Sequence, residues 1–232
     1  MATPGLVVAL TKPKHPDLTL DTYNKWYDTI HLQDVVDGGL GDLAVRYQHV
    51  DPSKPLPYIA LYRVPDVAFL GDTAKMDAIP KTSDMLPGPS RDWREVLENE
   101  IRGYIHVQSY EGPNADAGRG KGRAIVTFVA NVPEETEKDL DAWYREEHLA
   151  LLAKCTGYIR STRYQLIPGA GFTGPKFLAI HEWESPNLPM EELERTVMST
   201  EWSKKIMGVA TDVDRGVWTY VSEYQTGGDS RL

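Results

Sequence analysis

Trp26-Tyr27-Asp28-Thr29-Ile30-His31-Leu32 is the stretch of sequence that decides the fold, because its pattern occurs twice. It recurs 117 residues later as Trp143-Tyr144-Arg145-Glu146-Glu147-His148-Leu149. Four further pairs of positions match in the same order: Arg46-Tyr47 with Arg163-Tyr164, Ile59-Ala60-Leu61 with Leu178-Ala179-Ile180, Ser90-x-Asp92-Trp93 with Ser199-x-Glu201-Trp202, and Arg102-Gly103 with Arg215-Gly216. The 232-residue chain is therefore predicted to hold two copies of one module.

Hydrophobic periodicity predicts the order β-α-β-β-α-β for each copy. In the first copy the expected elements are strands 5–11, 43–50, 58–64 and 101–110, a helix over 20–36, a helical segment over 67–78, and a helix over 91–99 capped by Ser90. In the second copy they are strands 123–130, 158–167, 176–183 and 216–224, with helices over 137–153 and 190–207.

A four-stranded sheet with helices on one face leaves its other face to be buried, and a second copy supplies the partner sheet. Strand order, helix placement and the repeated Trp-Tyr-x-x-x-His-Leu helix resemble the dimeric α+β barrel superfamily, most nearly its EthD-like branch in fused tandem form. The resemblance implies an α+β fold in which two ferredoxin-like repeats pack their antiparallel sheets into an intramolecular barrel. We expect repeats at residues 1–113 and 123–225, a linker at 114–122 and a flexible tail at 226–232.

Composition and charge limit the kinds of binding partner and the cellular location that we expect for this protein. A net charge of −9 without a large basic cluster argues against nucleic acid, and no apolar run approaches the roughly 20 residues of a membrane helix. The single cysteine, Cys155, allows no internal disulfide. The last residues, Ser230-Arg231-Leu232, resemble a peroxisomal address read by the import receptor. We expect peroxisomal localisation on this basis and a cytoplasmic protein otherwise, with a merely frayed terminus as the alternative.

The repeated helix carries the candidate catalytic residues. Tyr27 and His31 lie one helical turn apart, as do Tyr144 and His148 in the second copy. An imidazole titrates near neutrality and can act as a general acid or base. The structural alternative is a core histidine bonded to a backbone carbonyl.

Polar aromatic side chains on two strands are the candidate substrate-binding groups. Alternation places Tyr58 and Tyr62 on one side of the third strand, and Tyr104 and His106, with Gln108 and Tyr110, on one side of the fourth. These groups predict a cavity with aromatic walls and several hydrogen-bonding groups, although a polar seam between the sheets is also compatible. Three further candidates are Arg46 in the first copy, and His181 and Trp218 in the second.

The first copy is 10 residues longer than the second between the third strand and Ser90, and the excess includes the proline-rich segment 79–89. A lid over the first cavity and a neutral insertion are equally compatible with this loop. A lid would make the first copy the working half and the second a structural partner.

Motifs for nucleotide cofactors, metal ions and serine nucleophiles are missing, so we expect neither cofactor nor metal. Haem stays open only because some proteins with this fold bind it through a histidine. The resemblance implies a cofactor-free lyase or cyclase acting on a small hydrophobic, aromatic or polyketide-like metabolite by decarboxylation, dehydration or ring closure. Alternatives are a non-catalytic binding or accessory protein and a cofactor-independent monooxygenase. Both a monomer and a homodimer are compatible with the sequence.

Overall fold

The computed structural model describes residues 1–113, 115, 122–227 and 231–232. The order of its hydrogen-bonded strands is β1-β3-β2-β8-β5-β7-β6-β4, and β4 pairs back with β1, which makes a closed antiparallel barrel. The α+β barrel fold predicted from the repeated motif is confirmed.

Two compact units divide the chain. Unit 1 comprises residues 1–106, 167–173 and 220–232, and unit 2 comprises residues 107–166 and 174–219. The two 15-residue strands, β4 (Leu97–Glu111) and β8 (Thr211–Gln225), each begin in one unit and end in the other. Predicted linker residues 114 and 116–121 lie outside the described residues.

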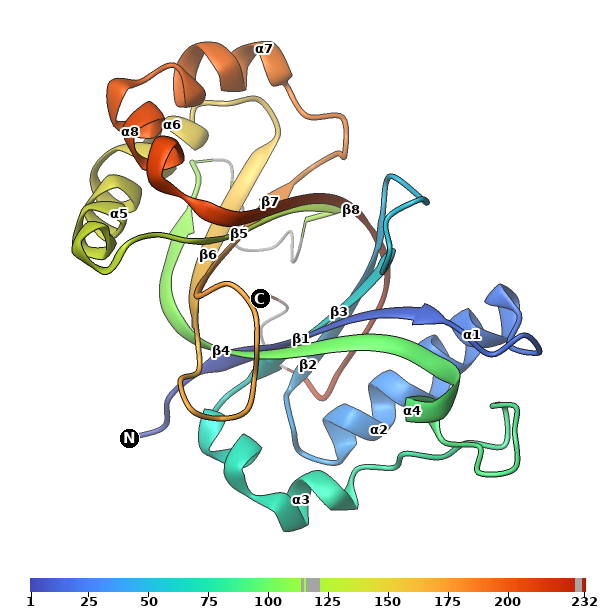
Figure 1. Ribbon diagram of the computed structural model, residues 1–232. Helices are drawn as coiled ribbons and strands as arrows, with labels where there is room; N and C mark the ends of the chain where they lie inside the picture. The colour runs from blue at the N-terminus through green and yellow to red at the C-terminus, as the bar shows by residue number, and fades with distance from the viewer. Residues whose placement is uncertain (114, 116–121, 228–230) are drawn as a thin grey trace. The chain divides into compact units, whose positions relative to one another are not determined.

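Unit 1 covers one face of its sheet with a helix that begins at the Thr19 cap, whose hydroxyl accepts from the Thr22 N–H. Figure 1 shows α1 and α2 running along strands β1 to β3. A buried aromatic and aliphatic core fills the space between helix and sheet. The elements are β1 (Gly5–Pro13), α1 (Leu20–Trp26), the π-helical turn η1 (Tyr27–His31), α2 (Leu32–Asp37), β2 (Leu43–His49), β3 (Tyr58–Val64), η2 (Val67–Gly71), α3 (Thr73–Ala78) and α4 (Trp93–Val96).

Unit 2 repeats this plan around its own core. Its elements are β5 (Ala124–Asn131), η3 (Glu134–Thr136), α5 (Glu137–Trp143), the π-helical turn η4 (Tyr144–His148), α6 (Leu149–Leu152), β6 (Tyr158–Leu166), β7 (Phe177–Trp183), α7 (Met190–Leu193), η5 (Glu194–Met198) and α8 (Glu201–Val209). The paired registers Val7↔Tyr62 in unit 1 and Val126↔His181 in unit 2 place the repeated strands at equivalent positions.

A π-helical turn interrupts each long helix within the repeated motif. The Leu32 N–H donates to the Tyr27 carbonyl, five residues back, and Leu149 does the same to Tyr144. In each motif the ring of the first residue, tryptophan, contacts the ring of the histidine five residues later. Turns of this kind are rare in proteins, and many of those that are known lie at functional sites.

The predicted helix over 91–99 is wrong in its extent and in its cap. Only Trp93–Val96 is helical, and the Asp92 carboxylate caps it by accepting from the Arg94 N–H. From Leu97 onward the chain is extended and pairs with β1, beginning at the register Pro13↔Leu97.

The last two residues contact unit 1. The Leu232 side chain is 8% exposed, and the Arg231 carbonyl accepts a hydrogen bond from Arg63 Nη1. Ser230 lies outside the described residues. Within the part of the chain that the structure describes, every helix is too short or too polar to cross a membrane.

Candidate functional site

The unit 1 cavity is small and lies between the helix and the sheet. Its volume is about 140 Å³, and three of the predicted residues line it, namely Tyr27, His31 and Tyr62. The Tyr62 hydroxyl is buried without a hydrogen-bond partner among the described residues. Burial, with Tyr27 alongside, raises the pKa of this phenol well above its ordinary value, so Tyr62 stays protonated.

His31 is held by ring contacts. Its imidazole stacks on Trp26 with centroids 4.6 Å apart and meets the edge of Tyr27 at 4.9 Å. Neither ring nitrogen forms a hydrogen bond with any described residue, so the expected alternative of a bonded core histidine does not apply here. Burial, reinforced by the positive charge of Arg46, lowers the pKa of His31 to about 3. The imidazole is therefore neutral at physiological pH.

Arg46 lies behind this cavity, fully buried, and does not line it. Its Nη1 donates to Asp28 at 2.9 Å and its Nη2 to Asn24 at 2.7 Å. The rings of Tyr23, Tyr27 and Tyr58 surround the guanidinium at 4.6 to 4.9 Å. Arg46 and Tyr58 thus form a structural cluster and are not part of the wall of the unit 1 cavity.

Two predicted residues of β4 point to the other face of the sheet. Leu97, Asn99 and Ile101 line the unit 1 cavity, so Tyr104 and His106, at alternate positions, face away from it. They share a face, as the alternation of β4 predicted, and that face is not the one that lines the unit 1 cavity.

Tyr104 is fully buried there, and burial lowers the pKa of the half-buried His106. Trp218 in unit 2 is also buried, and its indole N–H donates to Thr127 at 2.9 Å. Neither Tyr104, His106 nor Trp218 lines the unit 1 cavity or the two cavities of unit 2 that contain Tyr144.

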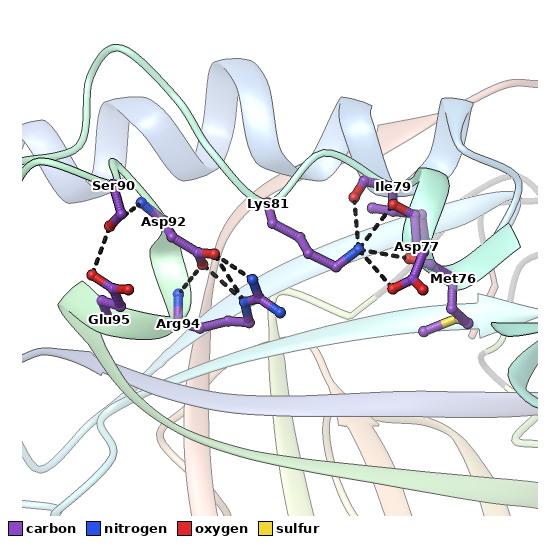
Figure 2. Close-up of polar contacts among 8 residues, drawn as sticks. All are labelled: Met76, Asp77, Ile79, Lys81, Ser90, Asp92, Arg94 and Glu95. Carbon is purple, nitrogen blue, oxygen red and sulfur yellow. Dashed lines mark hydrogen bonds and ion pairs between the residues drawn. The ribbon is translucent and has the colours of Figure 1, made fainter. Parts of the chain in front are cut away.

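The insertion of the first copy packs against the unit 1 cavity. Ile79, Pro80 and Lys81 line it, and Leu86 is buried in the core at 3% exposure. Figure 2 shows how both ends are fixed: the Lys81 ammonium group contacts the carbonyls of Met76, Asp77 and Ile79 at 2.9 to 3.5 Å, and the second group holds Ser90, Asp92, Arg94 and Glu95 together. The start of the segment thus forms part of the cavity wall, and its role as a lid stays a prediction.

Unit 2 holds a larger cavity, here called the histidine cavity. Its volume is about 470 Å³, and His148 and His181 line it together with Tyr144. Most of the remaining wall is apolar: Val126, Phe128, Trp143, Leu152, Trp183, Leu188, Met190, Leu193, Val197, Met198, Met207 and Val217. The sequence preference for the first copy as the working half finds no support in cavity size.

His148 and His181 approach each other with ring centroids 6.0 Å apart. His148 packs on Trp143 at 4.0 Å, and its Nδ1 is sealed without a partner among the described residues. Burial, followed by the nearby His181 and Arg163, lowers its pKa well below the ordinary value. Burial, followed by the charge of Arg163, lowers the pKa of His181 to about 4.

A buried chain of hydroxyl groups orients His181. Its Nδ1 lies 2.6 Å from the Ser161 hydroxyl, which lies 2.8 Å from the Tyr158 hydroxyl. Ser161 does not line the histidine cavity, so the pair is not arranged as a nucleophile and its base. Sequence reasoning missed Ser161 and Tyr158, because the bulge at Ile159 shifts the alternation of β6.

A second cavity of unit 2, here called the arginine cavity, has a volume of about 390 Å³. Arg163, Arg145, Asp141 and Gln165 line it, and it shares the wall residue Tyr144 with the histidine cavity. Sequence comparison found Arg163 only as the repeat of Arg46 and gave it no role. Among the described residues, no group of three or more His, Cys, Asp or Glu side chains is arranged to hold a metal ion.

The chain is 32% identical over 234 residues to core atranone cluster protein 1 of Stachybotrys chlorohalonatus, a match that covers 97% of this chain and 93% of that protein. The chain belongs to the family of this protein. No protein-family model matches it.

Solved structures share the fold of this atranone cluster protein 1 family at low identity. An anthrone oxidase-like protein has a TM-score of 0.62 at 14% identity, covering 98% of this chain and 95% of that one. A monooxygenase-like protein of Fusobacterium nucleatum has a TM-score of 0.58 at 10% identity, with 100% and 99% coverage. A chlorite dismutase variant of Candidatus Nitrospira defluvii has a TM-score of 0.59 at 10% identity, with 95% and 92% coverage. These likenesses support the dimeric α+β barrel fold.

Proposed function

We propose that the protein is a cofactor-free enzyme that moves a proton on a small aromatic or polyketide-like metabolite in the histidine cavity. The observation that carries this proposal is the pair of neutral imidazoles, His148 and His181, facing one mostly apolar cavity. Cavities that bind small molecules measure about 300–1,000 Å³. The histidine cavity is of that size and the unit 1 cavity is not.

The chemistry follows from the state of the two rings. A neutral imidazole accepts a proton from a carbon next to a carbonyl group, which breaks the C–H bond and leaves an enolate. The imidazolium that forms is paired with this enolate inside apolar walls, where their attraction is strong. In a dehydration, the same proton passes to the leaving hydroxyl, so water departs and the imidazolium returns to neutral imidazole.

Tyr144 supplies a hydrogen-bond donor in this scheme. Burial raises its pKa to about 12, although the charge of Arg163 opposes the rise, so the phenol stays protonated. A protonated phenol beside His148 can donate to the developing oxyanion. His181, oriented through Ser161, is the second proton carrier. In unit 1 the corresponding pair, Tyr27 and His31, lines a cavity too small for an aromatic metabolite and serves as an internal control.

The relative and the fold support this proposal at a coarser level. The relative is named for a core atranone cluster, which fits a role in secondary metabolism, and an anthrone oxidase-like protein shares the fold. We further infer that the family belongs to the EthD-like branch, supported by the two Trp-Tyr-x-x-x-His-Leu helices. A lyase or cyclase and a cofactor-independent oxygenase share the proton abstraction and differ in whether oxygen is consumed.

Two carbon acids, anthrone and benzoylacetone, test the proposal. The wild-type protein should accelerate exchange of their acidic C–H protons in D₂O, followed by NMR under nitrogen. His148→Ala should lower the rate at least about a hundredfold, as expected for loss of a general base, whereas the matched His31→Ala should change it less than about threefold. Oxygen uptake in air then separates oxygenation from lyase chemistry.

Binding without exchange would make the protein a binding or accessory protein and refute the catalytic proposal. Binding is followed through the fluorescence of the tryptophans, of which Trp143 and Trp183 line the cavity. Binding of neither compound would refute the aromatic substrate class. An equal loss of exchange in His31→Ala and His148→Ala would refute the choice of unit 2.

A further inference from the structure

The two repeated arginines, Arg46 and Arg163, differ in how many of their guanidinium nitrogens form hydrogen bonds. Arg46 donates through both Nη atoms, and its Nε is sealed. Arg163 donates only through Nη1, to Gln108 at 2.7 Å and to Asp141 at 2.9 Å. Its Nε and Nη2 carry no hydrogen bond to any described residue, although the side chain is only 6% exposed and lines the arginine cavity.

Two substitutions between the repeats explain the difference. Asp28, which neutralises Arg46, corresponds to Arg145 in the second copy, and Asn24 corresponds to Asp141. Arg145 donates to the same Asp141 carboxylate that Arg163 uses. One carboxylate therefore faces two guanidinium groups in unit 2, whereas one carboxylate faces one guanidinium group in unit 1. The charged side chains that line the arginine cavity are Lys138, Arg145 and Arg163 against Glu137 and Asp141, which leaves one excess positive charge.

The pKa values of the two arginines agree with this count. Burial lowers the pKa of Arg163, and Tyr144 and Asp141 do not fully compensate. Burial also acts on Arg46, but Tyr23 and Asp28 outweigh it and raise its pKa. Arg163 is thus a buried cation with incomplete compensation, and such a group is costly unless an anion joins it.

The groups that line the arginine cavity indicate which kind of ligand would fit it. The free edge of Arg163, Nε with Nη2, is planar and matches the two oxygens of a carboxylate. The Tyr144 ring lies 4.1 Å from the guanidinium carbon and supports it from one side. Apolar residues make up much of the remaining wall: Val107, Phe128, Ala130, Val132, Leu140, Phe177, Leu178, Ala179, Ile206 and Met207.

We propose that the arginine cavity is a binding site for an aromatic carboxylate, with the carboxylate on Nε and Nη2 of Arg163 and the ring against the apolar wall. The site does not depend on the proton-transfer proposal, because it involves neither His148 nor His181. It adds a second ligand site to unit 2 that the first copy lacks.

Binding of 2-naphthoate, measured by isothermal titration calorimetry at neutral pH and moderate salt, tests the proposal. The wild-type protein should bind it saturably, and at least about tenfold more tightly than the neutral analogue 2-acetonaphthone, because hydrogen bonds to charged groups are the strong ones. Arg163→Met should weaken 2-naphthoate at least about tenfold and leave 2-acetonaphthone nearly unchanged. The matched variant Arg46→Met should change both less than about threefold.

Gln165→Trp is a second variant that keeps every charge and fills the cavity from a half-buried position. It should abolish 2-naphthoate binding, and it replaces Arg163→Met if that variant does not fold. Three results would overturn the proposal: no saturable binding to the wild-type protein, equal affinity for the acid and its neutral analogue, or wild-type affinity in either folded variant.

Discussion

Three buried imidazoles should make the protein lose stability as the pH falls below about 6.5. His31 has a pKa of about 3 and His181 of about 4, and the pKa of His148 lies well below its ordinary value. In the unfolded chain each has a pKa of about 6.5. Below that pH these histidines bind protons in the unfolded chain but stay unprotonated in the folded chain. Stability is therefore complete above about pH 6.5 and falls toward the folded pKa values.

The size of the loss follows from these values. Between about pH 7.5 and pH 5, His31 and His181 each lower the free energy of unfolding by about 2 kcal/mol, together about 4 kcal/mol, and His148 lowers it further. Most carboxyl groups titrate below about pH 5, so histidines dominate this window. Because a typical domain has only about 5–15 kcal/mol of stability, the loss is large enough to bring the protein near unfolding.

Urea unfolding followed by tryptophan fluorescence at about pH 7.5 and pH 5 measures the loss. His181→Gln should reduce this loss by about 2 kcal/mol, whatever the variant does to absolute stability. Tyr144→Phe, which alters the neighbouring ring without removing an imidazole, should leave it unchanged. A wild-type loss below about 1 kcal/mol would mean that the imidazoles accept protons without cost, and it would refute both their burial and their neutral state in the proposed mechanism.

Three further predictions concern packing and the C-terminus. Leu86→Ala should lower the free energy of unfolding by about 2–4 kcal/mol, because this insertion residue is 3% exposed; a urea-unfolding change under about 1 kcal/mol would contradict its place in the core. Gly103→Ala should lower the free energy of unfolding by about 1–3 kcal/mol, because a Cβ there would lie 2.4 Å from the Phe172 ring. An unchanged melting temperature in thermal unfolding would contradict this prediction. The peroxisomal expectation requires Arg231 and Leu232 to leave their contacts with unit 1, and deleting Ser230-Arg231-Leu232 from a fluorescent fusion should then turn a punctate signal diffuse; a diffuse full-length signal would contradict the expectation.

The elements that the sequence predicted well are those set by periodicity and repetition. The predicted long helices over 20–36 and 137–153 agree closely with the observed helical stretches, because apolar residues at three- and four-residue spacing specify a buried helix face. The sequence does not predict the π turns within these helices, because one extra residue in a turn does not change the amino-acid composition in a recognisable way. The predicted one-turn stripe of Tyr27 and His31 therefore missed the five-residue contact of Trp26 with His31.

Faces were harder to predict than elements. Alternation shows which residues share a side of a strand, but it does not say which side meets the helices. Tyr62 and Tyr104 were placed together for that reason, yet only Tyr62 lines the unit 1 cavity. Cavity volume was also beyond the sequence, because it depends on how side chains from several elements meet.

The two copies differ both in the insertion and in the partner of the repeated arginine. In unit 1, Leu86 and Ile79 of the insertion pack into the core, and Arg46 donates to Asp28 and Asn24. Unit 2 has no such segment, and Arg145 replaces the neutralising aspartate. The same motif then has an apolar cavity on one side of Tyr144 and a cationic one on the other. Shortening the insertion alone should therefore not turn unit 1 into a copy of unit 2, because its arginine would remain neutralised by Asp28; that would additionally require Asp28→Arg.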